Sequence, residues 1–254
     1  MAKKAGHKWL VFPLILLAVP LAYWLVMPDI SSLKRKTPHK TSFMKYREKE
    51  WAEKRWGYKI TQAVVPLSKI SPYLRKAVLI GEDDKFWKHE GFDFESMQKA
   101  LEKDLQAGKF KAGGSTVTQQ LARNLYLSPE KSLLRKGAEA WITWRMEKVL
   151  SKKRILELYL NEVEWGAGIF GAEAAARHYF GKSASELSPW EAARMAAVLP
   201  NPIKYNPAGE QRYVVNRSKI IYNIMIKRGI VAPEYEEATG NDQSKGDAEA
   251  NVSP

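Results

Sequence analysis

Cysteine is absent from this chain of 254 residues. A disulfide framework and a thiolate metal site are therefore excluded, and disulfide bonds give no indication of the redox compartment. Histidine is scarce, and neither His89 nor His178 stands at metal-ligand spacing from another histidine. We interpret both as hydrogen-bonded structural residues and predict no metal site built from protein ligands. No segment of useful length alternates apolar and polar residues, which argues against a domain built mainly of strands.

Acidic residues are scarce in the N-terminal part of the chain. Residues 1–60 contain 13 Lys and Arg and four acids, out of 41 Lys and Arg and 28 acids in the whole sequence. The basic excess therefore belongs mostly to this part, and the remainder is only weakly basic. A nucleic-acid-binding domain needs a basic face on its folded part, so we expect no nucleic-acid partner. The distribution favours a segment close to a membrane.

One long run of the sequence lacks charge altogether. Residues 9–27 (WLVFPLILLAVPLAYWLVM) contain no charged side chain, and as a helix they would span about 28 Å, close to the ~30 Å hydrocarbon core of a bilayer. A cleavable signal peptide has a shorter apolar core, so we expect an uncleaved transmembrane anchor after a short N-terminal stretch, residues 1–8. Lysines lie on both sides of the run, and the local charges leave its orientation open.

The segment after this run, residues 28–60, interleaves aromatic and basic side chains, including Trp51, Trp56 and Tyr58. Two interpretations stay open. The segment is either an ordinary amphipathic linker helix or a membrane-proximal segment that lies on lipid headgroups, with rings in the interface and Lys and Arg near phosphates. We retain the basic, aromatic, membrane-proximal interpretation as the prediction.

Helix signals dominate the next part of the chain. Ser71, Ser128 and Ser188 each precede a proline, which is typical of a helix N-cap followed by proline at the first helical position. Ser188 and Glu191 have the spacing of a capping box. Residues 130–160 have few β-branched side chains and form a long run that favours helix.

These signals set the predicted domain boundaries. We expect a mainly α domain over residues 61–235. Residues 236–254 are mostly polar and lack large apolar side chains toward the end, so we predict a disordered tail there. The glycines of GAGIFG (residues 166–171) fit a dinucleotide-binding pattern, but that pattern requires a preceding strand. The preceding KRILELYLN favours a helix, so we expect these glycines to form a tight loop between helices instead.

An acidic cluster stands out in GEDDKFWKHEG, residues 81–91. Glu82, Asp83 and Asp84 are consecutive, and neighbouring carboxylates are expected to raise one another's pKa. By itself such a cluster is typical of a solvated turn. We ask whether one of these carboxylates takes part in catalysis.

Two polar clusters follow. GGSTVTQQLARN (residues 113–124) would place Gln120, Arg123 and Asn124 on one face of a helix, and RKGAE places Arg135 and Glu139 one turn apart. Each cluster alone is typical of a solvated helix surface. Acids and guanidinium groups together in an α domain suggest a site for a carbohydrate phosphate.

Residues 77–207 resemble the peptidoglycan glycosyltransferases of glycosyltransferase family 51, specifically the stand-alone, monofunctional, membrane-anchored members. The resemblance rests on EDDKFWKHEG, GGSTVTQQLARN, RKGAE and the run from ILELYLN through WGAGIFGAEAAARHYFGK to AAVLPNP, in this order. The family often has Lys where Arg123 stands, and both supply positive charge. Because only 47 residues follow Pro207, we expect no transpeptidase domain.

The resemblance implies a lysozyme-like α-fold and the polymerisation of lipid II. The donor would be the growing glycan on undecaprenyl diphosphate, and the acceptor would be the 4-hydroxyl of an incoming lipid II. An α-linked pyrophosphate leaves and a β-1,4 bond forms, so the reaction inverts the configuration. A sugar hydroxyl needs a carboxylate to take its proton, and the departing pyrophosphate needs cations.

Carried over motif by motif, the catalytic carboxylates fall on Glu82, as the general base, and on Glu139. The role of Glu139 stays open between orienting the pyrophosphate through a metal or water and positioning Arg135. Asp83 is expected to support the turn and Asp84 to be solvated. The resemblance implies sugar or pyrophosphate binding by Ser115, Gln119, Gln120, Arg123, Asn124, Arg135 and Lys136.

The resemblance also implies surroundings and partners. No cofactor is required; a divalent cation such as Mg²⁺ would suit the donor diphosphate, although no motif demands it. The expected location is the bacterial inner membrane, single-pass, with the catalytic domain on the outer face and residues 1–8 in the cytoplasm. Expected partners are lipid II, the growing lipid-linked glycan, the membrane and other cell-wall or division proteins.

Two alternatives stay open. A lysozyme-like peptidoglycan hydrolase would also use carboxylates, but with a general acid and a water. A non-catalytic, membrane-bound scaffold of the cell-wall machinery would have no need to retain both Glu82 and Glu139, and both are present.

Overall fold

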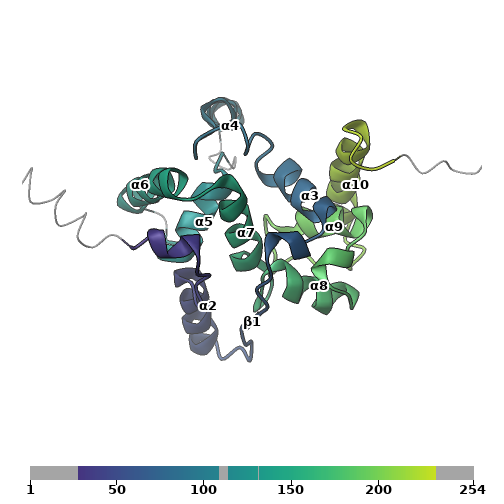
Figure 1. The fold of residues 1–254 in the computed structure, drawn as a ribbon, viewed down its shortest axis with the longest axis horizontal. Coiled ribbons are helices and arrows are strands. Elements are labelled where there is room, and N and C mark those ends of the chain that lie inside the picture. Colours follow the sequence, from purple (N-terminus) through teal and green to yellow (C-terminus); the bar gives the residue numbers. More distant parts are fainter. Residues whose placement is uncertain (1–27, 109–113, 131, 233–254) are drawn as a thin grey trace, which may run out of the picture.

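The computed structural model describes residues 28–108, 114–130 and 132–232, and this part of the chain is mainly helical (Figure 1). The prediction of a mainly α domain is confirmed. The elements, with η for short 3₁₀ helices, are η1 (Ser31–Lys34), α2 (Ser42–Glu53), β1 (Thr61–Gln62), η2 (Leu67–Lys69), α3 (Pro72–Glu82), α4 (Phe94–Ala107), α5 (Val117–Tyr126), α6 (Leu133–Val149), α7 (Lys152–Glu162), β2 (Glu164–Gly166), β3 (Ile169–Phe170), α8 (Ala172–Phe180), η3 (Ala184–Glu186), α9 (Pro189–Val198) and α10 (Arg212–Lys227).

Two of the three predicted serine caps are present. The Ser71 side chain accepts from the backbone of Tyr73 at the start of α3, and Ser188 forms a capping box with Glu191 at the start of α9. The cap predicted at Ser128 is wrong, because Ser128 lies in the irregular segment between α5 and α6. Ser132 caps α6 instead, since its hydroxyl accepts from the next turn's free backbone N–H.

The helix-favouring run at residues 130–160 forms most of two helices, α6 and α7. The chain leaves the helical conformation at Leu150 and Ser151, which separate α6 from α7. The Ser151 hydroxyl accepts from the backbone N–H of Arg154 at 3.2 Å, a local hydrogen bond that replaces helix continuation and starts α7. Leu150 is buried by the resulting turn.

The helices pack in two groups. In one group α9 packs against α3 and α10, and in the other α5 packs against α2, α6 and α7. Figure 1 shows the first group on the right and most of the second on the left. The small side chains of α9, such as Ala193 and Ala196, are fully buried and permit close approach of α3 and α10. The last residue of α3, Glu82, contacts a side chain from each of the two groups, Gln120 of α5 and Arg217 of α10.

A small sheet joins the glycine-rich run to the N-terminal part of the domain. Its order is β1–β3–β2, with β1 parallel and β2 antiparallel to β3. The loop predicted between helices at residues 166–171 is therefore wrong, because this run contains parts of two strands. Gly168 has a φ of +79°, and a Cβ there would lie 2.4 Å from the carbonyl oxygen of Lys59, so only glycine fits this turn.

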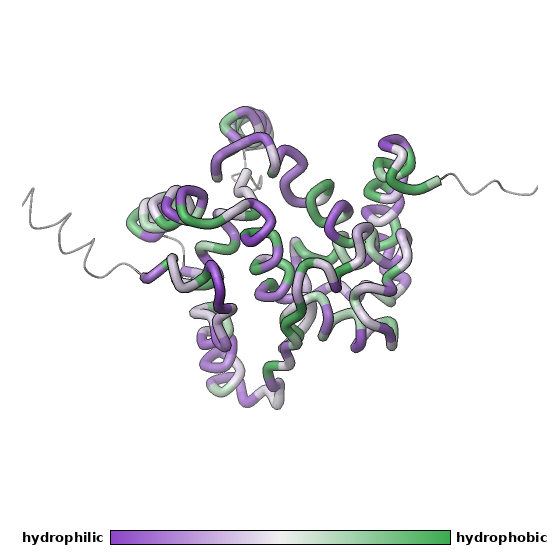
Figure 2. Tube along the Cα trace, viewed as in Figure 1, coloured by the Kyte–Doolittle hydropathy of each residue, from purple (hydrophilic) through white to green (hydrophobic). Residues whose placement is uncertain are grey.

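Residues 28–60 fold against the domain. Ile30 and Leu33 belong to the main hydrophobic core, and Met44 and Trp51 of α2 form a second buried cluster with Phe170. The core thus extends N-terminal to residue 61, the start of the predicted domain. Figure 2 shows mostly hydrophilic residues along α2, with apolar residues between them.

In the part of the chain that the structure describes, no helix is long and apolar enough to cross a membrane. The anchor predicted at residues 9–27, the preceding residues 1–8 and the tail predicted at 236–254 lie outside the described residues.

Candidate active site

Glu82 is the last residue of α3, and its carboxylate contacts both groups of helices. The side chain of Gln120 on α5 donates to Glu82 Oε2 at 3.0 Å. The guanidinium of Arg217 on α10 lies 3.9 Å from the other oxygen, Oε1. Only 12% of the Glu82 side chain is exposed, so a mostly buried carboxylate is held at the junction of α3, α5 and α10.

Burial raises the pKa of Glu82 above its usual value. The hydrogen bond from Gln120 and the positive charge of Arg217 act in the opposite direction, while the neighbouring Asp83 adds to the rise. The net direction is upward. A carboxylate with a raised pKa is a stronger base than an exposed one, which suits proton abstraction near neutral pH.

Asp83 and Asp84 have different hydrogen-bond partners from Glu82 and from each other. Asp83 accepts from the backbone N–H of Val117 at 2.9 Å and pairs with His89 at 2.9 Å, so it ties the α3–α4 turn to the start of α5. Asp84 pairs with Arg228, which lowers the pKa of Asp84. The expectation that neighbouring acids would raise the pKa of Asp84 is therefore wrong, because an ion pair outweighs the repulsion.

The amide of Gln120 is oriented by a second hydrogen bond. The hydroxyl of Tyr159 on α7 donates to Gln120 Oε1 at 3.1 Å. Because that oxygen accepts from Tyr159, the Gln120 amide nitrogen is directed toward Glu82. Tyr159 is fully buried, and it fixes the direction of this donor.

Glu139 is fully buried on α6 and is paired with two cations. Arg135 donates to its carboxylate at 2.7 Å, and Lys136 contacts the other oxygen. Burying a carboxylate is costly unless it is paired, and this arrangement supplies the pairing. Glu139 thereby fixes the direction of Arg135.

Two cavities adjoin this network. A cavity of about 310 Å³ contains Gln120, Arg123, Asn124 and Arg135 in its lining, so the predicted shared face of α5 is confirmed. A smaller one of about 180 Å³ contains Glu82 and Ser115. The remaining residues that line the larger cavity are Phe43, Arg47, Pro129, Val163, Glu164, Leu199, Pro200, Asn201 and Pro202.

Three of the predicted site residues line neither cavity. Gln119 is buried, and its side-chain oxygen accepts from the backbone N–H of Thr116 at 3.0 Å, which completes a capping box at the start of α5. Lys136 and Glu139 reach the larger cavity only through their neighbour Arg135. Gln119 thus stabilises the start of α5, and Glu139 holds Arg135, which faces the cavity.

The sequence of this chain matches a known protein family. The family described as Transglycosylase matches residues 48–226. The chain is 52% identical over 189 residues to the biosynthetic peptidoglycan transglycosylase of Aromatoleum aromaticum, covering 73% of this chain and 82% of the relative. It is 46% identical over 219 residues to the protein of the same name from Azoarcus sp., covering 85% and 95%. This chain belongs to the transglycosylase family.

Sequence reasoning missed several residues of the site in this transglycosylase-family chain. Arg217 lies on α10, beyond the motifs, and its contact with Glu82 depends on how α10 packs. Arg47 of α2 donates to Glu164 at 2.8 Å, and both line the larger cavity. Tyr159 stands inside the ILELYLN run, but only the fold shows that its hydroxyl reaches Gln120.

Among the described residues, no group of three or more His, Asp or Glu side chains has the arrangement of a metal site. The cavity that holds Arg123 and Arg135 carries cationic donors, which suit an anionic ligand.

Proposed function

We propose that this chain polymerises lipid II into β-1,4-linked glycan strands and releases undecaprenyl diphosphate, as a peptidoglycan glycosyltransferase of bacterial cell-wall synthesis. The observation that carries the proposal is the position of Glu82. It lines the smaller cavity and is hydrogen-bonded to Gln120, which lines the larger, cationic cavity. The family membership and the names of the relatives support the same activity.

The larger cavity would hold the donor diphosphate. The side chain of Arg123 makes no hydrogen bond or ion pair with the described residues, so its charge is available to a ligand. Arg135 is aimed by Glu139, and Asn124 supplies an amide for phosphate or sugar oxygens. Charge that develops on the departing pyrophosphate would be met by these two guanidinium groups.

The smaller cavity would admit the acceptor hydroxyl. Glu82 takes its proton as the new bond forms, with Ser115 available to hydrogen-bond the sugar. Gln120 holds the carboxylate in place, and Tyr159 holds Gln120. The nucleophile thus enters from the side of Glu82 and the pyrophosphate leaves toward the arginines, which gives inversion at the anomeric carbon.

Glu139 acts in this proposal as a positioning residue for Arg135 and Lys136, with no proton transfer of its own. Both of its oxygens are engaged by cations on its own helix. A divalent cation such as Mg²⁺ at the donor diphosphate is part of the proposal only as an addition, since Arg123 and Arg135 already supply positive charge there.

The proposed location follows from the substrate. A lipid-linked substrate requires the domain to work at a membrane surface, and we infer a single-pass inner-membrane protein with its catalytic domain outside. The uncharged run at residues 9–27 supports this location. Other cell-wall or division proteins are the partners that we propose beyond the lipid-linked glycan.

The test is product analysis with two substrates. Purified full-length protein is given labelled lipid II in detergent, and, separately, purified lipid-free cell wall. We expect long glycan strands from lipid II, resolved on a gel, and no reducing ends from the cell wall. Release of reducing ends from the cell wall without polymer would instead establish the hydrolase, and absence of both products would establish the scaffold.

A further inference from the structure

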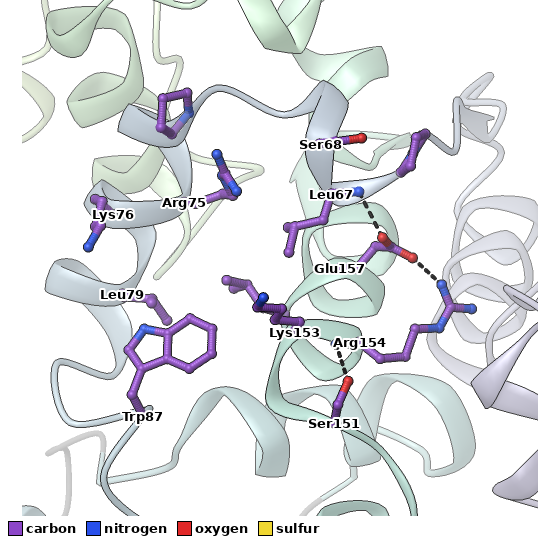
Figure 3. Close-up of a pocket in the computed structure, with 13 residues that line it drawn as sticks. Leu67, Ser68, Arg75, Lys76, Leu79, Trp87, Ser151, Lys153, Arg154 and Glu157 are labelled. Carbon is purple, nitrogen blue, oxygen red and sulfur yellow. Dashed lines mark hydrogen bonds and ion pairs between the residues drawn. The ribbon is translucent and has the colours of Figure 1, made fainter.

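A third cavity lies apart from Glu82. It has a volume of about 680 Å³, and it lies between α3, α7 and the segment around η2. None of its lining residues is shared with the two cavities of the active site. Figure 3 shows Arg75, Leu79 and Trp87 on one side of this α3–α7 cleft, and Leu67, Lys153 and Glu157 on the other.

Part of the cleft surface is apolar. Leu67, Leu79 and Leu156 line it together with Trp87, whose side chain is half exposed at 50%. Leu79 and Leu156 are themselves buried, so the apolar surface open to the cleft is that of Leu67 and Trp87, and an apolar group bound there would remove it from water. The volume lies in the range of small-ligand sites.

The same cleft is basic. Its single acid, Glu157, is already engaged, because it accepts from the backbone N–H of Leu67 at 2.7 Å and pairs with Arg154. The charged groups of Arg75, Lys76 and Lys153 make no hydrogen bond or ion pair with the described residues. Arg75 Nε is buried without a partner. With three cationic side chains unpaired and its one acid engaged, this cleft is suited to an anionic group.

We propose that the α3–α7 cleft binds an anionic membrane phospholipid. Its phosphate contacts Arg75 and Lys153, and one hydrocarbon chain lies along the apolar surface open to the cleft, that of Leu67 and Trp87. Free phosphate would use the cations but leave the apolar lining uncovered, and a zwitterionic lipid would bring its own cation to a basic site. The choice of a lipid rests on the membrane location proposed above. The site lies outside the catalytic network, so it is additional to lipid II binding.

The experiment uses the full chain in a neutral detergent and calorimetric titration with three probes. These are a short-chain phosphatidylglycerol, a short-chain phosphatidylcholine and inorganic phosphate. We expect phosphatidylglycerol to bind at least tenfold more tightly than either of the other two. The double variant Lys76→Glu/Lys153→Glu, at two exposed positions of the cleft, is expected to weaken phosphatidylglycerol binding at least tenfold.

The matched control is Lys219→Glu/Lys227→Glu, which reverses two exposed charges on α10 outside the cleft. It is expected to bind phosphatidylglycerol like the wild type. Trp87→Ser tests the apolar part and is expected to weaken phosphatidylglycerol without changing phosphate binding. All variants should polymerise lipid II in detergent at the wild-type rate, which separates this site from the proposed function.

Three results would overturn the proposal. Phosphate binding as tightly as phosphatidylglycerol would make the cleft an anion site without a lipid. Equal affinity for the two lipids would remove the role of the basic residues. Loss of lipid II polymerisation in the cleft variant, at unchanged thermal stability, would make the cleft part of the substrate path.

Discussion

At the scale of single residues, the candidate site depends on the carboxylate of Glu82. Burial raises its pKa, the nearby charge of Arg217 limits the rise, and the side chain of Gln120 holds the carboxylate by a hydrogen bond. The neighbouring Asp84 has the opposite environment, because Arg228 lowers its pKa. The pKa values of these two acids thus shift in opposite directions, because Glu82 is mostly buried whereas Asp84 is half exposed and hydrogen-bonded to Arg228 just after α10.

This difference predicts a shift in the pH profile. Since Arg217 lowers the pKa of Glu82, Arg217→Gln should raise it further, and less of the base is ionised at a given pH. The acid limb of the lipid II polymerisation rate should therefore move to higher pH. Arg228→Gln, which removes the partner of Asp84, is the control and should leave the acid limb in place. The idea fails if both variants have the wild-type profile.

The cationic cavity gives a second prediction. Arg123→Lys should be mild, because a point charge still meets phosphate. Arg123→Ala should lose transition-state stabilisation of roughly 2–4 kcal/mol, by analogy with a lost oxyanion donor. Arg135→Ala should be equally severe, and it also leaves buried Glu139 with one cation fewer. Rates of lipid II consumption at matched thermal stability are the measurement. Equal rates for Arg123→Lys, Arg123→Ala and the wild type would contradict the donor site.

At the scale of elements, α2 is the piece whose role the sequence left undecided. The aromatic residues of α2 and of the segment that follows it divide between two environments, with Trp51 of α2 buried against the domain and Trp56, after α2, about half exposed. Only two of the twelve residues of α2, Met44 and Trp51, are buried. Charged residues surround them in the sequence, so the sequence pattern does not indicate a buried face. The interleaving pattern that suggests a lipid surface therefore includes residues of the domain core.

Two truncations separate the anchor from the fold. Removal of residues 1–27 should leave a folded domain that polymerises lipid II in detergent, since every motif of the site lies after Ala77. Removal of residues 1–60 also removes Ile30, Leu33, Met44 and Trp51, which are all buried. At about 1.5–3 kcal/mol for each buried apolar side chain, the loss is comparable with the whole stability of a domain, about 5–15 kcal/mol.

Circular dichroism and thermal melting check both truncations. We expect a cooperative melt for the shorter deletion and no cooperative melt for the longer one. A cooperative, wild-type-like melt after removal of residues 1–60 would show that α2 is dispensable for the fold.

The sequence predicts the elements wherever a local signal decides them. Ser71 and Ser188 cap their helices because a hydroxyl next to proline at the first helical position is a local signal. Ser128 has the same pattern, but α6 begins after Ser132, and only the fold decides between the two serines. The turn at Gly168 depends on its approach to Lys59, more than a hundred residues earlier, which no local pattern contains.

Some residues of the candidate site could be predicted from local sequence patterns, and others could not. The positions of Glu82, Gln120 and Arg123 follow from the motifs and the helical period, and the structure places them around adjoining cavities. Arg217 and Arg47 could not be found this way, since each reaches the site through the packing of a helix distant in sequence.

At the scale of the whole molecule, stability should depend on the protonation of a second buried carboxylate. Glu162 ends α7 and is fully buried, with one oxygen accepting from Gln62 at 3.1 Å and the other without a partner. Burial raises the pKa of Glu162 to about 8. Because the folded-state pKa lies above the unfolded value, the neutral form stabilises the fold at low pH. This contribution is fully present below the unfolded pKa and is lost as the pH rises toward about 8.

Glu162→Gln tests this sign. The variant cannot ionise, so its free energy of unfolding should fall less than that of the wild type between pH 5 and pH 8. We expect a difference of roughly 2–4 kcal/mol in urea unfolding at the two pH values. Glu82 and Glu164 also have raised pKa values, and they affect both proteins alike. Parallel pH dependence of the two proteins would contradict the assignment to Glu162.

If Glu82 is the base for glycan polymerisation, removal of its proton acceptor should abolish most of the activity. Glu82→Gln keeps the shape of the side chain and removes the proton acceptor, at a position where the carboxylate is held by Gln120. The measurement is the rate of polymer formation from labelled lipid II by Glu82→Gln and wild type, at matched helical content and melting temperature. We expect the rate of Glu82→Gln to be lower by ~10²–10⁴-fold, the usual contribution of a general base. Polymer formation by Glu82→Gln within a few-fold of the wild-type rate would contradict the role of Glu82 as the base.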